Sequence, residues 1–155
     1  MASKPDKFGI NFWIVADAKS KYMFNAIPYL GKDPTRPRNV DVPHDVCMKL
    51  LTPLYNQGYH VTTDNYFTSE QLAASLKIKQ ITLLGTIRKQ RREIPKKCEF
   101  LLKDKPLFTS LVFRSQDNIT LTAYKVKRSK VVYLLSTLHN TVSQPSAQKT
   151  ITRNC

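Results

Sequence analysis

Hydrophobic and polar residues along this chain of 155 residues follow first the period of a strand and then that of a helix. Residues 8–16 are nearly all apolar and lead directly to Asp17, which is typical of a strand buried on both faces. Residues 17–20 predict a turn, and residues 21–30 predict the returning strand of a β-hairpin. A polar, proline-rich loop is expected over 31–43.

After this loop, apolar residues recur at the spacing of a helix. Four of them fall at i, i+4, i+5 and i+8, so they share one face of a helix predicted over 44–55. Pro53 should bend or end this helix, because a proline inside a helix removes a backbone hydrogen bond. The four apolar residues are Val46, Leu50, Leu51 and Leu54.

The next stretch, residues 59–69 (YHVTTDNYFTS), reads as a strand, an exposed acid and the start of a helix. Its first five residues are β-prone and predict the strand. Thr68 followed three residues later by Gln71 fits a capping box, in which a hydroxyl and an amide satisfy backbone N–H groups at a helix start. We therefore expect a helix over 68–77 and a further apolar strand over 81–87.

The remainder of the chain predicts a basic segment and then β structure. Residues 88–97 follow the last strand directly and contain six lysines and arginines. Three short alternating segments come next, separated by polar turns, which is typical of an antiparallel β-meander. Its strands are expected over 108–114, 119–126 and 131–137, and the tail over 140–155 is expected to be irregular.

Composition limits the class of protein. Hydrophobic residues make up 41% of the chain and charged residues 23%, which is typical of a globular domain rather than a disordered one. No run of 18 apolar residues occurs, so no membrane span is expected, and the N-terminus lacks the apolar core of a secretory signal. The three cysteines, Cys47, Cys98 and Cys155, match no disulfide framework and no zinc spacing, which favours a reducing compartment.

Charge indicates a polyanionic partner. The net charge is +14, and residues 78–155 hold sixteen Lys/Arg against four Asp/Glu, whereas residues 1–77 hold nine against seven. DNA is the first candidate, because neutralised phosphates release counterions, and a solvated basic face is the alternative. RNA ranks lower because the β-meander lacks the aromatic signature of an RNA-recognition motif. The candidate phosphate contacts are Arg88, Lys89, Arg91, Arg92, Lys125, Lys127, Arg128 and Lys130.

Two acids mark a candidate metal site. Asp17 and Asp64 each stand where a predicted strand ends, which is where open α/β sheets place their ligands. The element order is the early layout of a ribonuclease-H-like fold, in which these two strands pair in parallel and bring the carboxylates within roughly 4–8 Å. Clustered acids suit two Mg²⁺ ions, which take oxygen ligands and assist phosphodiester transfer. Alternatively, Asp64 and Asn65 only form a turn, since both residues suit turns.

Five segments between Lys4 and His139 also resemble a known family: KPDKFGINFWIVADAKSKYM, IPYLGKD, GYHVTTDNYFTS followed by QLAASL, LLGTIRKQRREIP, and ITLTAYKVKRSKVVYLLSTLH. They resemble the piggyBac transposases. The resemblance implies that Asp17 and Asp64 are catalytic metal ligands, that Mg²⁺ is the cofactor, and that transposon-end DNA and TTAA targets are the partners in a nuclear protein. It also implies a partial ribonuclease-H-like core over 1–95, a small antiparallel β insertion over 96–139, and a tail over 140–155.

The resemblance is incomplete in ways that bear on function. The third acid of the family lies in a GGVD-type motif that these residues do not contain. Counterparts of the family's N-terminal DNA-binding and dimerisation region and of its cysteine-rich zinc-binding region are also absent. We therefore expect a truncated catalytic domain that is inactive alone, binds Mg²⁺ weakly and forms a homodimer only with the missing regions. A domesticated, non-catalytic DNA-binding protein is the alternative.

Overall fold

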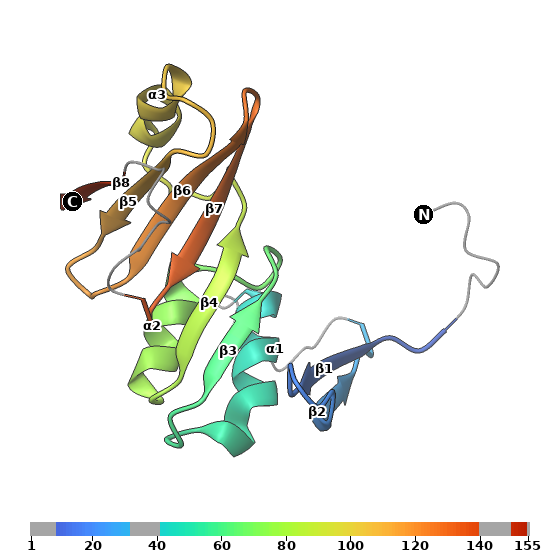
Figure 1. The fold of residues 1–155 in the computed structure, drawn as a ribbon. Helices are drawn as coiled ribbons and strands as arrows, with labels where there is room; N and C mark the ends of the chain where they lie inside the picture. The colour runs from blue at the N-terminus through green and yellow to red at the C-terminus, as the bar shows by residue number, and fades with distance from the viewer. Residues whose placement is uncertain (1–8, 32–40, 140–149, 155) are drawn as a thin grey trace. The chain divides into compact units, whose positions relative to one another are not determined.

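The computed structural model describes residues 9–31, 41–139 and 150–154, and its fold is mixed α/β (Figure 1). The chain divides into two compact units, Met1–Pro53 and Leu54–Cys155. The sheet of the first unit has two strands and that of the second has six. The expected fold class, α/β with a mixed sheet and helices, is confirmed.

The first unit is a β-hairpin with one helix against it. Strands β1 (Phe12–Ala16) and β2 (Met23–Pro28) pair antiparallel, as the sequence predicts. Helix α1 (Val42–Leu51) contacts both strands. The side-chain amide of Asn25 on β2 donates a hydrogen bond of 3.0 Å to the carbonyl of Leu50, which fixes the hairpin to the end of the helix.

The two faces of β1 differ in burial. Trp13 and Val15 are half-buried, whereas 52% of Phe12 and 55% of Ile14 are exposed. Successive side chains of a strand point to opposite faces, so the helix covers only one of them. The expectation of a strand buried on both faces is therefore wrong for the described part of the chain.

Helix α1 starts earlier and ends earlier than the predicted range 44–55. Pro43 lies in its first turn, where the missing N–H of proline costs no hydrogen bond. The helix ends at Leu51 and passes into a 3₁₀ turn, Thr52–Leu54. This turn contains Pro53, which confirms that the proline ends the helix.

The second unit is built on one continuous sheet. Its elements are β3 (His60–Thr63), α2 (Glu70–Ile78), β4 (Thr82–Ile87), α3 (Lys97–Lys103), β5 (Ser110–Arg114), β6 (Thr120–Lys127), β7 (Lys130–Ser136) and β8 (Thr150–Asn154). The strand order is β3-β4-β7-β6-β5-β8. Strands β3 and β4 are parallel, the pairs from β4 to β5 are antiparallel, and β8 runs parallel to β5.

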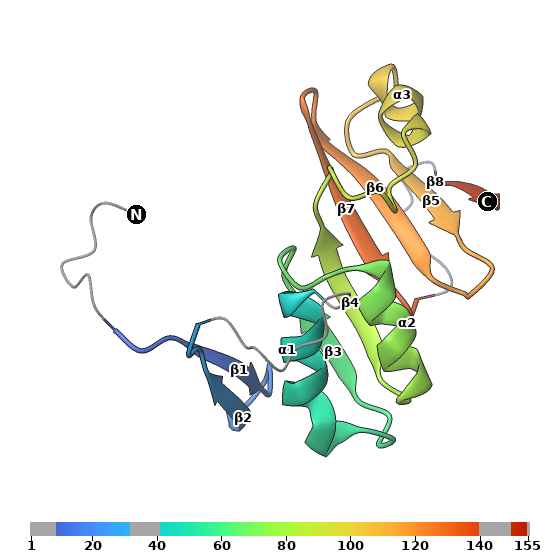
Figure 2. The same ribbon diagram turned by 180° about the vertical axis from the view of Figure 1, so that it is seen from behind.

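Helix α2 connects the two parallel strands and covers one face of the sheet beside β4 (Figure 2). Its Leu72 and Leu76 are fully buried, as is Leu83 of β4. Each such leucine stabilises the fold by about 1.5–3 kcal/mol relative to an exposed position. Among the helices of the described ranges, none is long and apolar enough to cross a membrane.

The β-rich region after β4 shares the sheet of the preceding strands, because β7 pairs with β4. The structure of this region differs from its prediction in two ways. Helix α3 was not predicted. Its buried Cys98 and Leu102 do stand at helical spacing, but two apolar positions within a strongly basic sequence are a weak indication of a helix. The tail, predicted to be irregular, contributes strand β8.

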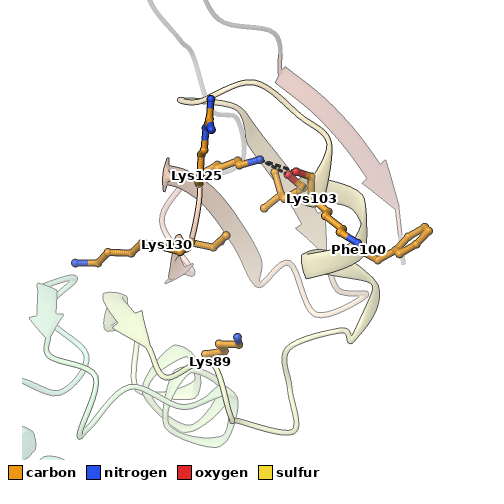
Figure 3. Close-up of a pocket in the computed structure, with 9 residues that line it drawn as sticks. Lys89, Phe100, Lys103, Lys125 and Lys130 are labelled. Atoms are coloured by element: carbon orange, nitrogen blue, oxygen red, sulfur yellow. Dashed lines mark hydrogen bonds between the residues drawn. The ribbon is translucent and has the colours of Figure 1, made fainter.

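A buried lysine holds α3 to the sheet. Lys125 on β6 is 5% exposed, and its ammonium donates hydrogen bonds to three backbone carbonyls at and just beyond the end of α3. Figure 3 shows the bonds to Leu102 and Lys103. The distances are 2.8 Å to Leu102, 2.8 Å to Lys103 and 2.7 Å to Lys105. A lysine has three N–H donors, so all of them are used. A cation is also favourable here because the last carbonyls of a helix are its negative end.

We predict that Lys125→Met lowers the free energy of unfolding by roughly 1–3 kcal/mol, because buried carbonyls lose a charged donor. Chemical denaturation measures this change. Lys127→Met is the matched control, since this lysine lies on the same strand but is exposed, and it should shift stability by no more than about 0.5 kcal/mol. Equal effects of the two substitutions would contradict a structural role for Lys125.

Candidate functional site

Asp17 follows β1 directly and lies in the turn of the hairpin. Its Oδ2 accepts hydrogen bonds from the hydroxyl and the backbone N–H of Ser20, both at 2.5 Å. These bonds lower the pKa of Asp17 because they stabilise the ionised carboxylate, and the bond from the hydroxyl has the largest effect. Asp17 is therefore charged at neutral pH.

Asp64 follows β3 and opens the connection to α2. Its Oδ1 accepts hydrogen bonds from the backbone N–H groups of Tyr66 at 3.0 Å and Phe67 at 3.4 Å, which forms a turn closed by the side chain. The residue is exposed, and Oδ2 has no hydrogen-bond partner within the described ranges. The turn and the candidate ligand are therefore compatible, because each uses a different oxygen.

Helix α2 is capped by Ser69 and not by Thr68. Ser69 has an extended backbone, and its hydroxyl accepts a hydrogen bond of 3.2 Å from the backbone N–H three residues on. The predicted capping box of Thr68 and Gln71 is thus wrong by one residue. Thr68 cannot serve as the cap because its hydroxyl donates to the Asp64 carbonyl at 2.7 Å and pairs with the Thr63 hydroxyl at 2.8 Å.

Gly85 on β4 lies directly beneath this acid turn. It is the register partner of Thr63, and it is buried. A Cβ at this position would lie 2.6 Å from the Thr63 hydroxyl, 2.7 Å from its carbonyl, and closer still to the Thr68 hydroxyl. Only glycine therefore allows the two threonines to pack against β4 and fix the turn that carries Asp64.

Arg88 links the acid turn to the basic segment. Strands β3 and β4 are parallel, so the residues that follow them emerge at the same edge of the sheet. The Arg88 Nε donates a hydrogen bond of 3.2 Å to the side-chain oxygen of Asn65, and its guanidinium lies 5.7 Å from the centre of the Tyr66 ring. The basic segment 88–97 thus begins beside Asp64.

The structure separates the predicted phosphate contacts into two groups. The prediction of Lys125 as a DNA contact is wrong, because this lysine is buried and its three N–H donors are bound to carbonyls. The other candidates are exposed or half-exposed and come from the basic segment and from the turn between β6 and β7. They are Arg88, Lys89, Arg91, Arg92, Lys127, Arg128 and Lys130.

Among the residues that the structure describes, no group of three metal-binding side chains (His, Cys, Asp or Glu) is found. Asp17 belongs to the first unit and Asp64 to the second, so their pairing stays a prediction. Asp104 directly follows α3 as its C-cap, and Asp117 lies in an exposed turn where its carbonyl accepts a hydrogen bond from Lys77.

A family model described as "Transposase IS4" matches residues 1–154. The chain belongs to this transposase family. A solved structure of piggyBac transposase, in a synaptic complex with hairpin DNA, matches with a TM-score of 0.82 and 34% sequence identity. The match covers 95% of this transposase chain and 30% of that protein, so the chain spans less than a third of its relative. The resemblance to piggyBac transposases expected from the sequence is confirmed.

Sequence reasoning missed the residues that position the acid in this transposase chain. Gly85 stands inside an apolar strand, and a glycine there often marks a close approach of another backbone, so its signal was present. The pairing of Thr63 with Thr68 and that of Arg88 with Asn65 carry no signal in the sequence. They depend on the parallel alignment of β3 with β4.

We predict that Gly85→Ala displaces the acid turn and lowers the free energy of unfolding by roughly 1–3 kcal/mol through overpacking. Chemical denaturation gives the stability, and amide chemical shifts over residues 63–68 report the displacement. Gly9→Ala is the control, since a Cβ there meets nothing within 4 Å and should leave both readouts unchanged. Unchanged shifts over 63–68 in Gly85→Ala would show that the turn does not depend on this glycine.

Proposed function

We propose that this chain is part of the catalytic domain of a piggyBac-like transposase that cuts and joins DNA at TTAA sites. The observation that carries the proposal is the Asp64 turn, which presents a carboxylate at the end of β3 beside the first cation of the basic segment. An acid that can hold a metal next to a cation that can hold a phosphate is suited to phosphodiester transfer. The matching fold of piggyBac transposase supports the same activity.

Asp17 and Asp64 would be the Mg²⁺ ligands. Both fit this role, because each carboxylate is held in place by the backbone of its own turn. In Asp64, Oδ2 also accepts no hydrogen bond from the described residues. The lowered pKa of Asp17 keeps that ligand ionised. When bound, two Mg²⁺ ions would activate the attacking water or hydroxyl and stabilise the leaving oxygen. A ribonuclease-H-like arrangement, with the two carboxylates close enough to share the ions, is part of the proposal.

The exposed cations would hold the DNA backbone. Arg88, Lys89, Arg91 and Arg92 follow β4 at the edge that carries Asp64, so they can hold the strand whose phosphate reacts. A second set, Lys127, Arg128 and Lys130, lies at the turn between β6 and β7. Transposon ends and TTAA targets are the proposed substrates, and a nuclear location follows from them.

Two acids cannot complete the proposed reaction. Two Mg²⁺ ions repel each other, and their near-octahedral shells need more carboxylate than Asp17 and Asp64 supply. We therefore infer weak metal binding, no activity of the 155 residues alone, and a homodimer only where the regions missing relative to the family are present. The alternative function, a domesticated DNA-binding protein without catalysis, is favoured by the net charge of +14 together with the lack of a three-acid cluster among the described residues.

The first test of the proposal is metal binding and strand transfer. We predict that the 155-residue protein binds Mn²⁺ weakly, that Asp64→Asn abolishes this binding, and that no cleavage of transposon-end DNA occurs with Mg²⁺ or Mn²⁺. Calorimetry and a gel assay provide the measurements, with Asp117→Asn as the control for an exposed turn acid. Metal binding that is unaffected in Asp64→Asn would favour the non-catalytic alternative. Cleavage lost in Asp64→Asn would show that another residue completes the site.

The second test concerns DNA. We predict weak binding to duplex DNA with little sequence preference, and a reduced dependence on salt when Arg91 and Arg92 are replaced by alanine, since each phosphate contact adds about 0.9 to the slope of log K against log salt. Fluorescence anisotropy at several salt concentrations measures the slope. Replacement of Lys19 and Lys21, exposed lysines of the hairpin turn, is the charge-matched control. An unchanged slope in the arginine variant would assign this segment to a solvated face.

A further inference from the structure

A second group of cations surrounds a cleft between α3 and the turn that joins β6 to β7 (Figure 3). The cleft has a volume of about 490 Å³. Besides the buried Lys125, its cationic side chains come from three separate segments: Lys89 follows β4, Lys103 belongs to α3, and Arg128 and Lys130 lie at the junction of β6 and β7. Of the side chains that the structure describes, no acid lines the cleft, so its charge is strongly positive.

An exposed aromatic ring stands at the same cleft. Phe100 on α3 lines this cleft and is 78% exposed. Exposure of an apolar ring to water is unfavourable, so a partner that covers the ring would stabilise it. The half-buried Val131 adds apolar surface to the lining. The buried Lys125 fixes the end of α3 to β6, so the helix that carries Phe100 is held at a defined place beside the cations.

We propose that this cleft binds an unpaired stretch of DNA, with its phosphates held by Lys103, Arg128 and Lys130 and one base stacked on Phe100. Single-stranded nucleic acids are bound in this way, by a positive groove that follows the backbone and aromatic rings that accept the bases. A base within a duplex has both faces covered by its neighbours, so Phe100 can stack only on an unpaired one. The volume lies within the range of about 300–1,000 Å³ that is typical of ligand-binding clefts.

A neighbouring cleft supports a continuous path for the strand. It has a volume of about 480 Å³, and its lining includes Arg91, Arg92 and Lys96 of the basic segment. Lys89 lines both clefts. A strand that leaves the edge carrying Asp64 could therefore pass along the basic segment and reach Phe100. This inference rests on the proposed function, because it takes DNA as the partner.

The experiment compares single-stranded and duplex DNA. Fluorescein-labelled 12-nucleotide DNA, as a single strand and as a duplex of the same sequence, is titrated with the 155-residue protein at fixed salt. Phe100→Ala should weaken binding of the single strand by roughly 5- to 100-fold and leave duplex binding unchanged, whereas Phe100→Trp should retain the affinity. Addition of the single strand should also quench tryptophan fluorescence more in Phe100→Trp than in the wild type, because the added tryptophan stacks on a base.

Ile78→Ala is the matched control, since this residue is also 78% exposed but lies on α2, away from the residues that line the cleft. It should change neither affinity, and all variants should keep the thermal midpoint of the wild type. If Phe100→Ala leaves both single-strand and duplex affinity unaffected, the proposal that the cleft binds unpaired DNA is wrong, whereas the proposed function still stands. An equal loss for single strand and duplex would overturn stacking on an unpaired base. A wild type that binds no DNA would overturn the proposed function itself.

Discussion

The close packing of Thr63 and Thr68 against Gly85 is the constraint on which the candidate site depends. The two hydroxyls form a chain that ends at the Asp64 carbonyl, and the chain fits only because β4 presents no side chain at this point. Parallel pairing of β3 with β4 sets the register that places Gly85 opposite Thr63. The position of the acid is thus determined by the interior of the sheet and not by the exposed turn itself.

This construction explains how a turn residue can also serve as a metal ligand. A carboxylate has two oxygens, and in Asp64 a single oxygen, Oδ1, satisfies the backbone of the turn. Asp17 is likewise held by backbone N–H groups of its own turn. The side chain is therefore held in place before any ion arrives, which reduces the ordering that binding would require. Arg88 adds a link from this turn to the basic segment through Asn65. Acid and cation then belong to one connected structure.

The lysines and arginines of the second unit have different roles despite their similar appearance in the sequence. Lys125 and Lys127 lie two positions apart on one strand, yet the first is buried against the end of α3 and the second is exposed. The buried lysine stabilises the helix whose Phe100 and Lys103 line the cationic cleft. Net charge thus indicates the class of partner, whereas burial decides which cations can reach it.

The sequence by itself determined the hairpin, helices α1 and α2, strands β3 to β7, the likeness to piggyBac transposases and the two acids at strand ends. These features depend on local periodicity and on short segments, which a chain carries without its fold. Tertiary structure alone decided that Ser69 caps α2, that α3 and β8 exist, and that Lys125 is buried. The physical reason is that these features depend on packing between segments that the sequence does not show to be neighbours. Thr68 is occupied by Thr63 and packs against Gly85 of β4, β8 pairs with β5, and Lys125 finds its carbonyls on α3 and just beyond it, more than 20 residues away.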